Sequence, residues 1–143
     1  AFTSKKMYNQ NVEKPRQSWN VFYYEDAKGR CQVHDFIEKR QERERGKILA
    51  LLEKLEERGP HLPRPYADFL EQGIHELRVK LRGDQTRFLY FFCYRDFIII
   101  THVFTKNTSR VPSKEIRKAV KLRDDFLGRI RETDLRRRAN EDT

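Results

Sequence analysis

Apolar and polar side chains alternate strictly in one part of the chain. Within residues 74–81, Leu77 and Val79 fall on one side, and basic Arg78 and Lys80 fall on the other. A period of two is typical of a β-strand with one face on the core and one face outward. We therefore expect a strand here, with its basic side chains opposite the core.

Two nearly continuous apolar runs follow, at residues 86–94 and 97–104. Such runs are typical of central strands that are covered on most of both faces. Short turn sequences at 83–84 and 95–96 separate the three segments, so we expect consecutive antiparallel strands. An aromatic run at 19–24 predicts one further strand before them.

Helical periodicity is clearest in residues 42–58. Its apolar stripe consists of Ile48, Leu49, Leu51, Leu52 and Leu55. Gly59, which proline follows, is a strong stop signal. Gly46 lowers the stability of the helix by roughly 1 kcal/mol relative to alanine, so a break or kink is expected there. Asp35 can cap a short helix before this one, and Ser113 can begin a last helix after the strands.

These elements predict a single α+β domain with the order strand, two helices, three strands, helix. The length of 143 residues is near the commonest size of one domain. Residues 1–17 are polar and patternless, and we expect a flexible arm there. The domain is placed at 18–131, with the 42–58 helix on the Leu77 side of the sheet, and a charged, solvated tail at 132–143.

The chain is strongly basic, with 31 Lys and Arg against 22 Asp and Glu, a net charge of +9 and a pI near 9.7. This excess favours a polyanionic partner, with nucleic acid first and an anionic membrane surface second. No apolar stretch approaches the ~18 residues that span a bilayer, and no secretory pattern opens the sequence. We therefore expect a cytoplasmic protein that does not enter the membrane.

The excess charge is concentrated in two segments. Residues 106–123 carry seven basic side chains against Glu115 alone, whereas residues 35–58 carry seven of each sign. The strand segment adds Arg78, Lys80, Arg82 and Arg87. An antiparallel sheet would bring both segments to one surface, which suits phosphate binding. The alternative is that these residues only keep an exposed strand soluble or block edge pairing.

The sequence indicates neither a metal site nor a disulfide bond. Cys31 and Cys93 lie far apart, with no CxxC motif and no histidine pair nearby, so we expect two reduced thiols. No group of Asp, Glu and His has the spacing of metal ligands. Neither a metal nor another cofactor is expected.

Six segments in a fixed order carry a resemblance to a known family. They are residues 23–29 (YYEDAKG), 48–60 (ILALLEKLEERGP), 75–80 (HELRVK), 87–92 (RFLYFF), 102–108 (HVFTKNT) and 112–116 (PSKEI). This set resembles the phage-derived branch of the RelE/HigB toxin superfamily, over about residues 19–126. The resemblance implies a RelE/ParE-like fold, with a twisted, mainly antiparallel sheet, helices packed on one face and a basic concave surface on the other.

The resemblance also implies an activity and partners. Members are toxins of type II toxin–antitoxin systems that cut mRNA on the ribosome without a metal. The cognate antitoxin, usually a helix-turn-helix repressor in this branch, silences the toxin. Contact with operator DNA is then expected only through the antitoxin.

Metal-free RNA cleavage uses the 2′-hydroxyl of the RNA as nucleophile and leaves a 2′,3′-cyclic phosphate. The protein must neutralise the phosphorane and move protons, tasks that suit arginine and lysine respectively. By resemblance the catalytic set is Arg78 and Arg87 for charge, and Lys80 or Lys106 for proton transfer. The same resemblance indicates an RNA-binding set of Arg82, Tyr90, Arg110 and Lys114.

For two histidines and one tyrosine, both a functional role and a role in core packing are possible. His102 could act as acid or base, but a histidine in so apolar a strand is more often a hydrogen-bonded core residue. His75 lies on the Leu77 side, which favours core packing. Tyr90 suits packing as well as stacking on a base. The chain also departs from the family pattern, with Val103 where several members have glycine and no aromatic residue after Phe126.

Two other function classes remain open on the sequence. One is a ParE-like inhibitor that shares the fold and binds DNA gyrase. The other is a catalytically silent module that binds RNA or the antitoxin. Fold alone does not decide among them. The set of Arg78, Lys80, Arg87 and Lys106 favours the nuclease, since gyrase inhibition needs no basic side chains converging on one phosphate.

Overall fold

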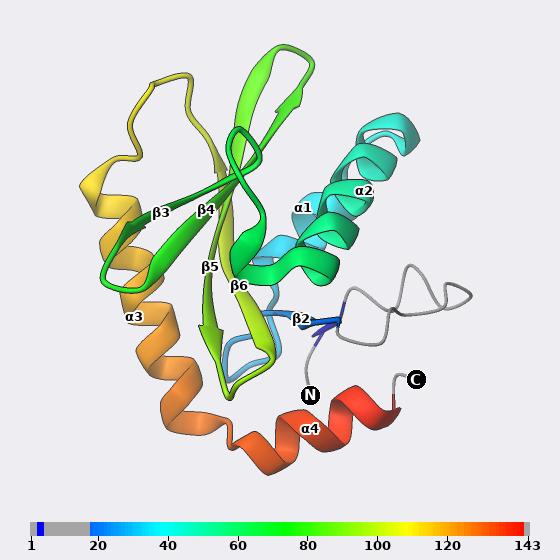
Figure 1. Cartoon of the computed structure of the whole chain (residues 1–143), viewed down its shortest axis with the longest axis vertical. Helices are drawn as coiled ribbons and strands as arrows, with labels where there is room; N and C mark the ends of the chain where they lie inside the picture. The colour runs from blue at the N-terminus through cyan, green and yellow to red at the C-terminus, as the bar shows by residue number, and fades with distance from the viewer. Residues whose placement is uncertain (1–2, 5–17, 142–143) are drawn as a thin grey trace.

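The computed structural model describes residues 3–4 and 18–141. Within them, six strands form one mixed sheet in the order β1-β2-β6-β5-β4-β3 (Figure 1). The strands are β1 (Thr3–Ser4), β2 (Asn20–Tyr23), β3 (Ala67–Glu71), β4 (Ile74–Leu81), β5 (Asp84–Cys93) and β6 (Phe97–Thr105). Apart from residues 3–4, the arm expected at 1–17 lies outside the described residues.

The predicted antiparallel meander is confirmed. In β4 and β5, Leu77 pairs with Phe88 and Arg78 pairs with Arg87, and β5 pairs in turn with β6. Leu77 packs in the core on one face, while Arg78 points to the other face, as the alternation predicted. The first strand, β2, joins the sheet parallel to β6, which makes the sheet mixed. The sequence did not predict β3, a short strand antiparallel to β4.

Four α-helices accompany the sheet in the described residues. They are α1 (Gln32–Glu38), α2 (Glu42–Arg58), α3 (Ser113–Arg129) and α4 (Glu132–Glu141). The expected break at Gly46 is wrong, because α2 runs through this exposed position without interruption. The predicted stop at Gly59 is confirmed: its φ of 51° favours glycine, and an added Cβ would lie 2.3 Å from the Trp19 indole.

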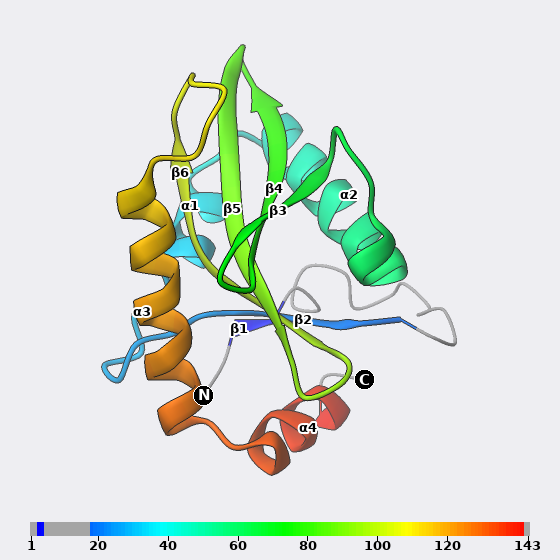
Figure 2. The same cartoon turned by 60° about the vertical axis from the view of Figure 1, so that its left-hand side comes forward.

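The helices cover both faces of the sheet, so the expectation of helices on one face is wrong. One core joins α1 and α2 to the sheet through residues such as Leu52 and Phe88. A second core joins α3 and α4 to the opposite face, for example through Phe91 and Phe126. Figure 2 shows α2 and α3 on opposite sides of β4 and β5. The physical reason is that β5 and β6 are apolar on both faces, and each face must be removed from water.

The segment expected to be a solvated tail folds instead as α4. Leu135 and Ala139 are buried in the second core. Arg136 Nη2 lies 2.9 Å from Asp96 Oδ1, and its guanidinium lies 4.9 Å from the centre of the Phe97 ring. The helix therefore packs beneath the turn between β5 and β6 (Figure 1). No helix in the described residues is both long and apolar enough to cross a membrane.

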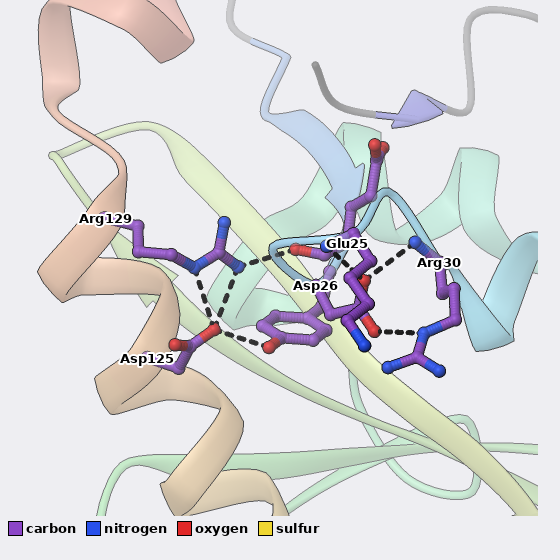
Figure 3. A network of polar contacts seen from close by, with 7 residues as sticks. Glu25, Asp26, Arg30, Asp125 and Arg129 are labelled. Carbon is purple, nitrogen blue, oxygen red and sulfur yellow. Dashed lines mark hydrogen bonds and ion pairs between the residues drawn. The ribbon is translucent and has the colours of Figure 1, made fainter.

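A polar network ties the end of β2 to α3 (Figure 3). Tyr24 Oη donates to Asp125 at 2.5 Å, and Arg129 donates both to Asp125 and to the Glu25 carbonyl. These bonds hold the pKa of Asp125 below its ordinary value. Asp26 closes the adjoining turn by accepting from Arg30. In this structure the YYED segment of the resemblance therefore joins two elements and lies outside the groove described next.

Candidate RNA-binding groove

A groove of about 910 Å³ opens between α2, the tip of the β4–β5 hairpin and the loop that follows β6. It exists because β3 pairs with β4 only as far as Leu77, which leaves the far end of β4 without a strand neighbour on that side. Five basic side chains line the groove: Lys47, Lys54, Arg78, Lys80 and Arg87. The concentration of positive charge makes it a candidate site for a phosphate chain.

Arg87 is the most buried of these cations, at 2% exposure. One terminal nitrogen donates to the backbone carbonyl of Thr108 in the loop after β6. Among the described residues, Nε and Nη1 have no hydrogen-bond partner. An unsatisfied buried donor costs about 1–3 kcal/mol or more. Arg87 also lines the groove wall, so its positive charge favours a phosphate group that enters the groove.

Glu76 lies between the two arginines that the sequence singled out. Glu76 is 3% exposed, and its carboxylate lies 3.4 Å from Arg78 Nε and 3.8 Å from Arg87 Nε. Burial raises the pKa of Glu76 above its ordinary value, and the two guanidinium groups oppose that rise. This residue was not among those predicted from the sequence. Glu76 lies two positions before Arg78, so the strand alternation already placed the two side chains on the same face. It was not singled out because an acidic side chain is not expected on a surface that binds phosphate.

Two groove lysines come from α2 and were also missed. Lys47 and Lys54 lie seven positions apart and therefore share one face of the helix. Lys47 Nζ donates to the Lys80 carbonyl, and Lys54 Nζ lies 4.3 Å from the centre of the Tyr66 ring. The balanced charge of residues 35–58 gave no reason to single them out. Only the packing of α2 beside β4 brings them to the groove.

Of the predicted catalytic set, Arg78, Lys80 and Arg87 meet in the groove, whereas Lys106 does not line it. Lys106 is exposed, and its backbone N–H donates to Gln85. The next three residues, 107–109, line the groove instead. The strand therefore delivers its basic residues to the site, while the loop turns the Lys106 side chain outward.

The predicted RNA-binding residues separate into different places. Arg82 occupies the hairpin turn with φ of 52°, and its Nε lies 3.6 Å from Glu44 Oε2 on α2, outside the groove lining. Arg110 and Lys114 are exposed and also lie outside the groove lining. None of the three shares the site of Arg87.

Tyr90 is not available for stacking on a base. It is 1% exposed, and its ring stacks on His75 with centroids 5.3 Å apart, on the face opposite Arg87. Burial raises its pKa above the ordinary value. The RNA-binding role is therefore wrong in this structure, and the packing alternative is confirmed. His75 likewise packs in this aromatic cluster, as predicted, and burial lowers its pKa.

His102 is a hydrogen-bonded core residue, which confirms the interpretation that the sequence favoured. It is 1% exposed, with Nε2 3.0 Å from Glu115 Oε1 and Nδ1 3.0 Å from Thr101 Oγ1. Burial lowers its pKa, although the bond to Glu115 opposes the shift. A register shift in the β5–β6 pairing turns His102 toward α3, whereas Ile98 and Ile100 face α2. The side chain does not line the groove.

Metal-binding chemistry was not expected, and the described residues hold no cluster of three or more His, Cys, Asp or Glu that could bind a metal ion. Cys31 and Cys93 are both free thiols. Burial raises the pKa of Cys93 to about 12, so its thiol is a poor nucleophile at neutral pH.

Comparison with known proteins covers most of the fold just described. Residues 35–124 match the phage-derived Gp49-like protein family (DUF891), a span that is more than half of the chain and includes every basic residue that lines the groove. None of the curated proteins matches the chain. The protein therefore belongs to the phage-derived Gp49-like family, a RelE-like family related to toxin–antitoxin systems.

Proposed function

We propose that this protein is a HigB-type toxin that cuts mRNA on the ribosome without a metal ion. The observation that carries the proposal is Arg87, a buried guanidinium on the wall of a basic groove, whose Nε and Nη1 form no hydrogen bond within the described residues. A structural arginine would be expected to have its donors satisfied within the protein. Arg87 instead keeps donors for a charged group that enters from outside.

The side chains of the groove match the steps of metal-free cleavage. The 2′-hydroxyl attacks the adjacent phosphorus in line, and the bond to the 5′ oxygen of the next nucleotide breaks. Arg78 and Arg87 stabilise the extra negative charge of the phosphorane. Lys80, two positions after Arg78 on the same strand face, supplies the amine for proton transfer, and Lys47 and Lys54 hold neighbouring phosphates. The products are a 2′,3′-cyclic phosphate and a 5′-hydroxyl.

The family membership points to an antitoxin as partner. We propose a helix-turn-helix antitoxin that covers the groove and carries the complex to operator DNA. An acidic segment of that antitoxin would compete directly with RNA for the five groove cations.

The decisive experiment compares two activities of the purified protein. Ribosome-bound mRNA and gyrase-driven supercoiling are assayed with the wild type and the Arg78→Ala/Arg87→Ala variant. The proposal expects wild-type cleavage of mRNA, loss of cleavage in the variant and normal supercoiling with both. Inhibited supercoiling without cleavage would support the ParE-like alternative. Inactivity in both assays, with antitoxin binding intact, would support the silent module.

A further inference from the structure

Six exposed cations outside the groove lie on the loop after β6 and on the α3 helix that directly follows it. This surface, here called the basic stripe, consists of Lys106, Arg110, Lys114, Arg117, Lys118 and Lys121. Figure 1 shows the loop running directly into α3 along one side of the molecule. The four helical members occupy positions i, i+3, i+4 and i+7, which share one helix face. The stripe is therefore a surface rather than a scatter of charges.

The side chains of the stripe are not paired with acidic residues of the part of the chain that the structure describes. In the described part of the chain, none of its six members forms an ion pair within 4.0 Å. Arg129 and Arg136, by contrast, are held by carboxylates. The one acid in this span, Glu115, points inward to His102 and is 14% exposed, so it leaves the outer face positive.

Helix stability does not account for these positions. Lys114 lies in the first turn of α3, where the helix dipole favours acids over bases. Lys114 with Lys118, and Arg117 with Lys121, are like charges at i,i+4, which disfavours the helix. Helix stability alone would favour other residues at these positions.

The surface chemistry identifies the partner class. Membrane-surface helices need an exposed apolar face, but the apolar face of α3, with Ile116, Ala119 and Phe126, is buried against the sheet. Single-stranded RNA is held by stacking on aromatic side chains, and the one aromatic residue of α3, Phe126, is fully buried. A lysine and arginine face of this kind is suited to contacts with phosphates, as in sequence-independent binding of a double helix.

We infer that the basic stripe is a docking surface for the backbone of double-helical RNA, separate from the groove. It adjoins the groove, because residues 107–109 line the groove while Lys106 and Arg110 flank them on the stripe. The inference rests on the proposed function, since a nuclease on the ribosome must hold structured RNA while a single strand enters its site. Duplex binding is nevertheless measurable without any cleavage.

The test uses a short RNA duplex as probe and the full chain as protein. The stripe variant is K114Q/R117Q/K118Q/K121Q, in which glutamine preserves helix propensity. The matched control is K28Q/K39Q/R43Q/R95Q, which removes four exposed charges that lie outside both the stripe and the groove lining. Circular dichroism confirms that both variants fold. Duplex affinity is measured by fluorescence anisotropy over a range of salt concentrations.

We expect the stripe variant to bind the duplex more weakly, with a salt slope reduced by about three to four units if each side chain contacts one phosphate. The control should retain most of the affinity. Equal losses in both variants would reduce the effect to net charge and overturn the inference, as would unchanged binding by the stripe variant. Anionic vesicles and an acidic peptide serve as further probes. If the stripe variant lost binding only to one of these probes and not to the duplex, the inference would also be overturned.

The R78A/R87A variant separates this inference from the proposed function. It should lose cleavage while its duplex binding stays close to that of the wild type. Normal cleavage by this variant would count against the groove mechanism alone. Loss of duplex binding by this variant, with the stripe variant unaffected, would place the duplex in the groove and overturn the inference.

Discussion

Arg87 Nε lies 3.8 Å from Glu76 Oε2, and both side chains are almost fully buried. Arg78 contacts the other oxygen of the same carboxylate, so one acid links the two arginines of the groove. A bidentate bond would occupy two donors of one guanidinium, whereas these contacts leave Arg78 Nε and two nitrogens of Arg87 without hydrogen bonds. Under the proposed function, Glu76 is therefore a positioning residue that holds the two guanidiniums in place.

Glu76→Gln tests this role. Glutamine keeps the shape but loses the charge, so the guanidiniums should lose their alignment while the groove lysines still bind RNA. We expect kcat to fall by about a hundredfold, as for a small misplacement of catalytic groups, with KM nearly unchanged. Single-turnover and steady-state cleavage assays measure the two constants. If Glu76→Gln lowers thermal stability together with activity, and changes kcat and KM alike, the role of Glu76 is purely structural.

The same variant has a pH signature. The pKa of Glu76 is raised in the folded protein, so the folded state binds more protons than the unfolded state above about pH 4.5. The free energy of unfolding should therefore contain a component that decreases as pH rises from 4.5 through the raised pKa. Denaturant titrations of the wild type and Glu76→Gln at several pH values should show this component only in the wild type.

Arg87→Ala separates chemistry from binding. Loss of one preorganised donor to the transition state typically lowers the rate by about a hundredfold to a thousandfold. Arg82→Ala should instead weaken ribosome binding, with a salt slope smaller by about one unit, and cleave at nearly the normal rate once saturated. Single-turnover cleavage of ribosome-bound mRNA at several salt concentrations distinguishes the two. A wild-type rate for saturated Arg87→Ala would remove Arg87 from the catalytic set.

Cleavage should continue in EDTA and leave 2′,3′-cyclic phosphate ends. The reason is that arginine and lysine supply the charge and the proton transfer in the proposed mechanism. End-group analysis of the fragments measures the outcome, and ribosomes incubated in EDTA alone control for loss of the substrate complex. Fragments with 3′-hydroxyl ends would contradict the mechanism.

His102 should contribute to loss of stability in acid. Its pKa is lowered in the folded protein, so the unfolded chain binds more protons once the pH falls below about 6.5. The free energy of unfolding should therefore decrease as pH falls through 6.5 toward the lowered pKa. His102→Gln removes this component. His75→Gln is the comparison, because burial also lowers the pKa of His75, and each variant should flatten the pH profile in part.

The C-terminal helix should contribute to global stability. Leu135→Ala removes a fully buried side chain from the second core and is expected to lower the free energy of unfolding by about 2–5 kcal/mol. Arg137→Ala, on the exposed side of the same helix, should change it by less than about 0.5 kcal/mol. Urea unfolding of both variants measures the difference. If both variants changed the free energy of unfolding by the same small amount, residues 132–141 would behave as the solvated tail that the sequence predicted.

Local periodicity in the sequence determined much of the fold. The alternation of Leu77 and Arg78 defined the strand and its two faces, and the short turns defined the antiparallel meander. A strand period leaves each side chain on a definite face, so the placement of Arg78, Lys80 and Arg87 on one side followed from the sequence. The positive charge of residues 106–123 was equally visible, because it depends on composition alone.

Contacts between distant segments were decided only by the tertiary structure. Glu76 is buried between two arginines because β4 and β5 pair in one register, and Lys47 reaches the groove because α2 packs beside the end of β4. Both β3 and α4 have only a few apolar residues, and both owe their place to neighbours that they meet on folding. Local pattern encodes which face a side chain takes. Which segment packs against that face depends on how the apolar surfaces of distant segments cover each other. This packing is determined by the whole chain.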